Sequence, residues 1–269
     1  MSEIIMSEFV KSGNIIVPKP EGLDFELKNG QIYRLKTERS FYGKKTFLEQ
    51  DGTIEIPKNI YKSKDEKFFI ERSIKYYNES GANTTGLMLY GEQGCGKTMF
   101  AKVIAKEINL PTIIVDPTFS TLDLIDFFTK FKTSVTILFD ELDKHCDPDR
   151  DNWDTKEMLE FLDGVQTTCK KLVIFTCNKD EIVNEFLKNR CGRIRYYKHF
   201  TKLSKDSIQD IVNTELKDCK DKIDETVEAI ITLVDLPSYD NVISICKEVK
   251  DWPEHVVTDL LTDLNVKLK

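Results

Sequence analysis

The sequence lacks the residue spacing that builds a zinc site. Its seven cysteines include no Cys-x-x-Cys pair, and its three histidines do not cluster with them. A structural zinc site is therefore not expected, because such sites need closely spaced cysteine and histidine ligands. An odd, scattered set of cysteines in an acidic chain instead indicates free thiols in a reducing compartment.

Long hydrophobic runs and an excess of positive charge are also missing. No apolar stretch reaches the roughly 18 residues that cross a bilayer, and the first residues lack the basic start and unbroken apolar run of a signal peptide. The formal net charge is −7, so no overall positive field would draw the chain to nucleic acid or anionic lipid. We therefore expect no membrane insertion.

The N-terminal part of the sequence favours strands. The chain has 269 residues, of which 40% are hydrophobic and 32% charged, a composition ordinary for a globular protein of two modest domains. Residues 1–20 carry only weak signals of order. Within residues 23–57, the pairs Asn29-Gly30 and Asp51-Gly52 supply the positive φ angles of tight turns. We predict two antiparallel hairpins joined by a loop around residues 39–43.

The middle of the chain alternates between short apolar runs and helical patterns. Near-continuous apolar strands that alternate with helices indicate a parallel sheet covered on both faces. The predicted strands are residues 86–90, 111–115, 135–139, 172–176 and 194–197, and the predicted helices are residues 65–79, 97–108, 121–132, 155–165 and 179–188.

After residue 202 the pattern is helical throughout. The clearest helices are predicted over residues 206–216, 225–234 and 239–249. We therefore predict three parts, which are an N-terminal β-hairpin module over residues 1–60, an α/β domain over residues 61–202 and a helical lid subdomain over residues 203–269.

The segment GEQGCGKT, residues 91–98, fits the phosphate-loop pattern G-x-x-x-x-G-K-[ST], with a predicted strand before it and a predicted helix after it. Glycines let backbone N–H groups face phosphates, and the helix N-terminus attracts anions. We expect Lys97 to hold the β- and γ-phosphates and Thr98 to place its hydroxyl on Mg²⁺. The alternative is a chance glycine-rich turn. The expected nucleotide-binding residues here are Gly91, Glu92, Gln93, Gly94, Cys95, Gly96, Lys97, Thr98 and Met99.

Two carboxylates follow the predicted strand at residues 135–139. Ligands of parallel sheets bind at the carboxyl ends of the strands, so Asp140 is placed to hold Mg²⁺ through water and is counted among the expected nucleotide-binding residues. Glu141 can accept a proton from the attacking water or orient it. The alternative is an acidic turn that caps the next helix. Asp143 is either a supporting acid, an acid that faces a neighbouring subunit, or a plain solvated charge.

Polar residues also follow the next two elements. Asn178 ends an apolar strand beside the predicted Asp140 strand, from which it could reach the attacking water. The alternative is a turn-forming asparagine. Arg190 and Arg193 come one helix later, and an arginine supplied by a neighbouring subunit can neutralise charge on the γ-phosphate. The alternative is the basic end of a helix.

The segments GEQGCGKT, ILFDELDK, FTCN and NRCGR occur in the order and rough spacing of the AAA ATPases, and the resemblance covers most of the chain, from about Thr53 to Lys250. Within that family the chain is most similar to the branch that contains the mitochondrial Rieske-protein translocase. Three stretches carry this similarity. The first runs from TIEIPKNIY to the phosphate loop, the second is MLEFLDGVQTTCKKLVIFTCN, and the third is RCGR.

The resemblance implies an AAA fold with a five-stranded parallel sheet and a helical lid. It implies ATP and Mg²⁺ as cofactors, ATP hydrolysis, and a homo-oligomeric ring of six or seven subunits that remodels or translocates a protein client. It also implies roles for particular residues, which are nucleotide ligands at Lys97 and Thr98, the Walker B pair Asp140 and Glu141, the first sensor Asn178, and arginine fingers Arg190 and Arg193 that act in trans.

The sequence departs from this branch at several positions. We find no transmembrane anchor, the N-terminal module is short, and Cys191 replaces the usual proline between the arginines. The usual aromatic pore loop is missing, and Phe119 either lines a pore or packs against a helix. Residues 238–241 (SYDN) stand where many members carry a second-sensor arginine. Small members without an anchor occur in bacteria and large phages, so we expect a cytoplasmic location.

Three functions fit these observations. The first is an ATP-driven protein remodeller or assembly chaperone, which we favour. The second is a nucleic-acid motor or loader, for which residues 39–45 (RSFYGKK) interleave basic and aromatic side chains, although the acidic charge opposes it. The third is a nucleotide-gated scaffold, against which the presence of Glu141 argues.

Overall fold

The computed structural model describes residues 9–18, 26–40, 43–56, 64–116, 119–146, 154–163, 169–183, 194–201, 203–235, 237–262, 264 and 266–269. The chain divides into two compact units. The first holds residues 1–56, 69–90 and 98–199. The second holds residues 57–68, the phosphate loop at residues 91–97, and the chain from Phe200 onward.

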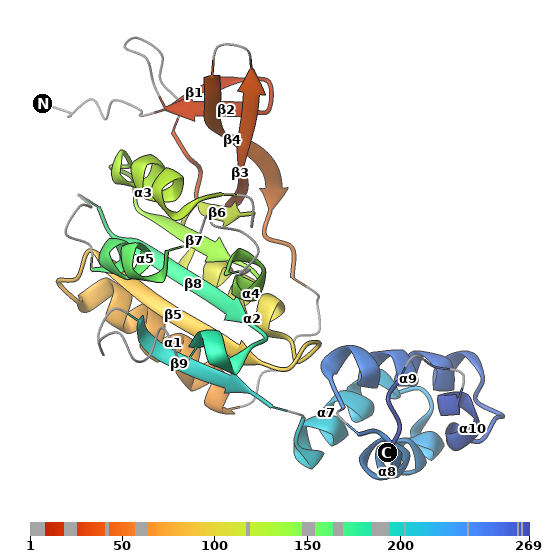
Figure 1. The fold of residues 1–269 in the computed structure, drawn as a ribbon. Helices are drawn as coiled ribbons and strands as arrows, with labels where there is room; N and C mark the ends of the chain where they lie inside the picture. The colour runs from red at the N-terminus through yellow and green to blue at the C-terminus, as the bar shows by residue number, and fades with distance from the viewer. Residues whose placement is uncertain are drawn as a thin grey trace, which may run out of the picture. The chain divides into compact units, whose positions relative to one another are not determined.

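In the described residues of the first unit, nine strands form one sheet in the order β1-β2-β4-β3-β6-β7-β8-β5-β9 (Figure 1). Strands β6, β7, β8 and β5 pair in parallel. The strands are β1 (Phe9–Ser12), β2 (Ile15–Pro18), β3 (Gln31–Ser40), β4 (Gly43–Thr53), β5 (Thr84–Gly91), β6 (Thr112–Val115), β7 (Val135–Phe139), β8 (Lys171–Cys177) and β9 (Ile194–Phe200).

Helices cover both faces of this sheet. Every residue of β7 and β8 is buried, which explains their nearly unbroken apolar sequences. On one face α3 and α5 pack through Phe128 and Phe161, and on the other α1 and α2 pack through Phe69 and Phe100 (Figure 1). The predicted α/β fold is confirmed. The helices are α1 (Lys64–Glu79), α2 (Lys97–Ile108), α3 (Thr121–Thr129), α4 (Leu142–His145) and α5 (Thr155–Leu162).

The predicted pair of hairpins is wrong. Strands β3 and β4 form a single long antiparallel hairpin in which Ser40 pairs with Gly43, so the predicted connecting loop is the hairpin turn. Gly30, with φ of 72°, instead precedes β3 and donates its N–H to the carbonyl of Leu110 at 3.3 Å. Gly52, with φ of 113°, lies inside β4 beside a shift in register. Both glycines adopt positive φ angles, but neither forms the turn of a hairpin. Gly30 makes a long-range contact, and Gly52 lies at a bulge.

The N-terminal strands join the central sheet directly. Residues 32–34 of β3 pair in parallel with residues 112–114 of β6. In the described part of residues 1–20, where the sequence predicts weak order, β1 and β2 pair antiparallel, and β2 pairs with β4. These partners are distant in the sequence, so local patterns could not predict the pairing.

The second unit contains the predicted C-terminal helices. They are α7 (Lys205–Glu215), α8 (Ile223–Leu233), α9 (Tyr239–Asp251) and α10 (Val257–Thr262), with a short 3₁₀ turn at Lys220–Lys222. Their apolar faces form one core that includes Ile211, Ile230, Val242, Ile245 and Cys246. Helix α9 begins at a capping box, in which Ser238 and Asn241 satisfy each other's backbone N–H groups.

The structure bears on three further predictions, which concern Phe119, a helix over residues 179–188 and membrane insertion. Phe119 is only 2% exposed and belongs to the hydrophobic core, so of its two predicted roles the structure favours packing. The predicted helix over residues 179–188 lies partly outside the described residues. Among the described helices, none combines the length and the apolar character that crossing a lipid bilayer requires.

Candidate nucleotide-binding site

The phosphate loop connects the end of β5 to the start of α2. Gly91, Gly94 and Gly96 have φ angles of 133°, 81° and 85°, which side chains rarely adopt. A Cβ atom at Gly91 would also lie 2.0 Å from the carbonyl oxygen of Phe200, and one at Gly94 would lie 3.4 Å from the Ser238 hydroxyl. Glycine is therefore required at Gly91 both by the backbone conformation and by the space.

The loop encloses the side chain of Lys97. This side chain is 6% exposed, and its ammonium group donates to the carbonyls of Gly91 at 2.8 Å and Glu92 at 2.5 Å. Cys95, in the same loop, is partly buried, and this burial raises the pKa of its thiol although the Lys97 charge lowers it. The loop thus holds one cation at the N-terminus of a helix, where anions bind favourably.

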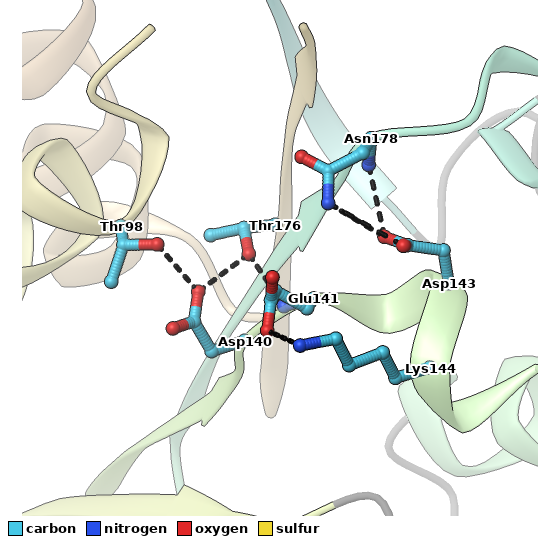
Figure 2. A network of polar contacts seen from close by, with 7 residues as sticks. All are labelled: Thr98, Asp140, Glu141, Asp143, Lys144, Thr176 and Asn178. Carbon is cyan, nitrogen blue, oxygen red and sulfur yellow. Dashed lines mark hydrogen bonds and ion pairs between the residues drawn. The ribbon is translucent and has the colours of Figure 1, made fainter. Parts of the chain in front are cut away.

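Thr98 and Asp140 meet at the carboxyl ends of the sheet strands. The Thr98 hydroxyl donates to Oδ1 of Asp140 at 2.8 Å (Figure 2). Hydroxyl and carboxylate oxygens are the hard donors that Mg²⁺ prefers, so the pair fits the predicted ion. In the part of the chain that the structure describes, no three acidic, histidine or cysteine side chains gather into a metal cluster.

Thr176 is a site residue that the sequence prediction missed. It lies in β8, is 1% exposed, and donates its hydroxyl hydrogen to Oδ1 of Asp140 at 2.7 Å. Its oxygen also accepts the backbone N–H of Glu141 at 2.8 Å. One buried hydroxyl therefore joins both acidic residues (Figure 2). The available signal was a lone hydroxyl residue in the apolar run LVIFTC, two positions before Asn178.

Glu141 adopts an unusual backbone conformation at the start of α4. Its φ and ψ are 54° and 61°, in the left-handed region, and its side chain makes no capping hydrogen bond to α4. The alternative of a simple helix cap is therefore not supported. The carboxylate instead pairs with the ammonium group of Lys144, and this pairing raises the pKa of Lys144.

Asn178 is held by Asp143. Oδ1 of Asp143 accepts the backbone N–H of Asn178 at 3.0 Å and lies 3.3 Å from its amide nitrogen. The alternative of a plain solvated charge at Asp143 therefore does not fit. Asp143 and Lys144 both belong to α4, so one short helix contacts both Asn178 and Glu141 (Figure 2).

A buried histidine lies close to Asp140. His145 is 1% exposed, and its ring meets that of Phe139 edge-on with centroids 5.5 Å apart. Burial lowers the pKa of His145 to about 4, although the charges of Asp116 and Asp140 raise it. The ring is therefore neutral near pH 7 and contributes packing rather than charge.

The predicted arginine fingers, Arg190 and Arg193, lie outside the described residues, as does Cys191 between them. The remaining predicted site residues divide into two groups. Gly91 to Lys97 form the loop in the second unit, while Thr98, Asp140, Glu141 and Asn178 lie in the first unit. Met99 follows in the first turn of α2.

Known proteins resemble this chain over the same region. The family model described as "ATPase family associated with various cellular activities (AAA)" matches residues 87–199. An ATP-dependent zinc metalloprotease FtsH from Parabacteroides distasonis is 23% identical over 76% of this chain and 32% of its own length. The "Probable mitochondrial chaperone BCS1-A" from Dictyostelium discoideum is 29% identical over 48% of this chain and 34% of its own length, which agrees with the predicted branch of the family. The matches thus span about a third of each of these two relatives.

A solved structure shows the same fold. The RuvB Holliday junction branch migration motor from Thermotoga maritima superposes with a TM-score of 0.56 over 77% of this chain and 70% of its own, at 13% identity. The fold, the phosphate loop, the acidic pair and the sequence relatives all agree with the predicted family. Residues 87–199 therefore form an AAA ATPase domain.

Proposed function

We propose that this chain binds ATP with Mg²⁺ and hydrolyses it within a homo-oligomeric ring. One observation carries the proposal, which is the polar network that joins Thr98, Asp140 and Glu141 through the buried hydroxyl of Thr176. Phosphoryl transfer depends mainly on positioning and on charge stabilisation, and this network positions both the expected metal ligands and the expected base.

Each residue has a role in this proposal. Lys97 binds the β- and γ-phosphate oxygens, while Thr98 and Asp140 hold Mg²⁺, which when bound neutralises charge on the phosphates. Glu141 accepts the proton of the attacking water or orients that water. Asn178 contacts the same water. Arg190 and Arg193 neutralise developing charge on the γ-phosphate of a neighbouring subunit.

We further propose that the ring remodels a protein client. ATP turnover would move subunits between two arrangements, and the β3–β4 hairpin would contact the client. The named relatives, an FtsH protease and a BCS1-A chaperone, support a protein client. A motor or loader that acts on nucleic acid is the second candidate, because RuvB is a branch migration motor. The net charge of −7 opposes this function. Salt-dependent binding to single-stranded DNA would favour that candidate.

The test compares Lys97→Ala with Lys106→Ala, an exposed lysine of the same helix. Wild type and Lys106→Ala should bind MgATP equally, and their particle mass should increase to that of a ring when MgATP is added. Lys97→Ala should bind at least about tenfold more weakly, because it lacks the charge that contacts the phosphates. Equal MgATP binding by all three proteins would contradict the assigned site, and a monomeric wild type with MgATP bound would contradict the ring.

A further inference from the structure

Asp143 holds both the main chain and the side chain of Asn178. Its Oδ1 accepts the backbone N–H at 3.0 Å, and its two carboxylate oxygens lie 3.3 and 3.4 Å from the amide nitrogen. Both residues are only partly exposed. Since Asp143 lies on α4 and Asn178 directly follows β8, the carboxylate ties these two elements together beside Glu141.

The chemistry of this contact determines which way the amide faces. An aspartate carboxylate accepts hydrogen bonds, whereas an asparagine side chain carries a donor nitrogen on one side and an acceptor oxygen on the other. The atom that faces Asp143 must therefore be the nitrogen. The amide oxygen is then turned away from Asp143, as Figure 2 shows.

This orientation restricts what Asn178 can bind. The oxygens of a γ-phosphate only accept hydrogen bonds, so an amide oxygen cannot bond to them. A water molecule can donate one hydrogen to this amide oxygen and the other to the carboxylate of Glu141. A lone pair on the water oxygen would then stay available to attack the γ-phosphate. We propose that Asp143 is a positioning residue that turns the amide oxygen of Asn178 toward the water that attacks ATP. This inference rests on the proposed ATP hydrolysis.

The competing explanation is that Asp143 only stabilises α4. An acidic residue in the first turn favours a helix through its dipole. That role does not require the paired contacts to the backbone and the amide of Asn178, and it would leave the amide free to present its nitrogen to the phosphate.

An exchange of the two side chains distinguishes these explanations. In Asn178→Asp alone, two carboxylates would oppose each other and the contact is lost. In Asp143→Asn with Asn178→Asp, residue 143 can donate from its amide to residue 178, whose second oxygen still faces the water as an acceptor. The number of charges is the same as in wild type. The measurements are kcat and KM for ATP hydrolysis, MgATP affinity, and the melting temperature of wild type, both single variants, Asp143→Ala and the exchanged pair.

We expect Asn178→Asp to lower kcat at least about tenfold, with MgATP affinity changed less than about threefold, because the lost contact orients water rather than nucleotide. The exchanged pair should recover kcat to within about fivefold of wild type. An exchanged pair that is no more active than Asn178→Asp would overturn the inference, because it would show that a donor is needed at residue 178. Full kcat in Asp143→Ala would also overturn it. A wild type without turnover would reject the proposed function and the inference together.

Discussion

At the scale of single residues, Thr176 holds the carboxylate of Asp140 and the backbone of Glu141. It is 1% exposed. The hydroxyl hydrogen bonds to the Asp140 carboxylate, and the hydroxyl oxygen accepts the backbone N–H of Glu141. A buried polar group that loses its partner costs stability, so the same residue links the stability of the fold to the geometry of the site.

Thr176→Val keeps the shape of the side chain and removes the hydroxyl. We expect kcat to fall at least about tenfold and the free energy of unfolding to fall by about 1–3 kcal/mol, because the N–H of Glu141 loses its partner. The Mg²⁺ concentration for half-maximal activity should rise as Asp140 becomes less constrained. Thr176→Ser is the control and should retain most activity. Equal activity of the Val and Ser variants would show that the hydroxyl plays no part.

Gly91 is required by the close approach of Phe200. A Cβ atom there would lie 2.0 Å from a backbone oxygen, and the φ of 133° disfavours any side chain. We expect Gly91→Ala to lower the free energy of unfolding by at least about 2 kcal/mol and to weaken MgATP binding. Gly81→Ala is the matched control, since a Cβ at Gly81 meets nothing within 4 Å. Thermal melts in which the two variants are equally stable would contradict this explanation.

At the scale of elements, the four-residue helix α4 contacts two residues of the candidate site. Asp143 contacts Asn178, and Lys144 pairs with Glu141, so the orientation of this helix affects both residues expected to contact the attacking water. Helix α4 could not be predicted from the sequence, because a single helical turn leaves no periodic pattern. The left-handed backbone at Glu141 also starts this helix without any glycine or cap signal.

The ion pair between Lys144 and Glu141 competes with water for the carboxylate. Lys144→Met removes this competition, so we expect kcat to rise by about two- to fivefold, a small change because exposed ion pairs are weak. Lys144→Arg keeps the charge and should behave like wild type. Steady-state ATP hydrolysis measures both variants. A loss of more than about tenfold in Lys144→Met would instead show that the ammonium group assists turnover.

The helical unit protects one of its cysteines. Cys246 is fully buried in the core formed by α7 to α10, and burial raises its pKa to about 12. We expect iodoacetamide at pH 8 to leave Cys246 unmodified in the native chain and to modify partly exposed Cys219 first. In denaturant both should react, as mass spectrometry of peptides would show. Rapid native labelling of Cys246 would contradict the packing of this core.

The same thiol makes stability depend on alkaline pH. Its pKa is raised from 9.0 to about 12 by folding, so the folded state binds the proton more tightly. This contribution to stability is fully present below pH 9 and is lost as the pH rises toward 12. Cys246→Val should therefore show a smaller loss of stability between these pH values than wild type does. Equal losses would contradict the raised pKa.

At the scale of the whole molecule, the alternation of apolar strands and helices was enough to predict the parallel sheet, since both faces of β7 and β8 are buried. The phosphate loop and acidic pair follow from spacing alone. The pairing of β3 with β6 could not be predicted, because residues 32–34 and 112–114 are far apart in the sequence. Thr176 was not predicted, and the role of Asp143 was left open among three alternatives. Both roles depend on contacts between β8, β7 and α4.

The most direct test of the central claim is ATP turnover by Glu141→Gln, with Glu228→Gln, an exposed residue of α8, as the control. We expect wild type and the control to hydrolyse ATP at the same rate. Glu141→Gln should bind MgATP as wild type does and hydrolyse it about a hundredfold more slowly, because it lacks the carboxylate proposed to activate water. Turnover by Glu141→Gln at the wild-type rate would contradict the assignment of the base and with it the proposed mechanism.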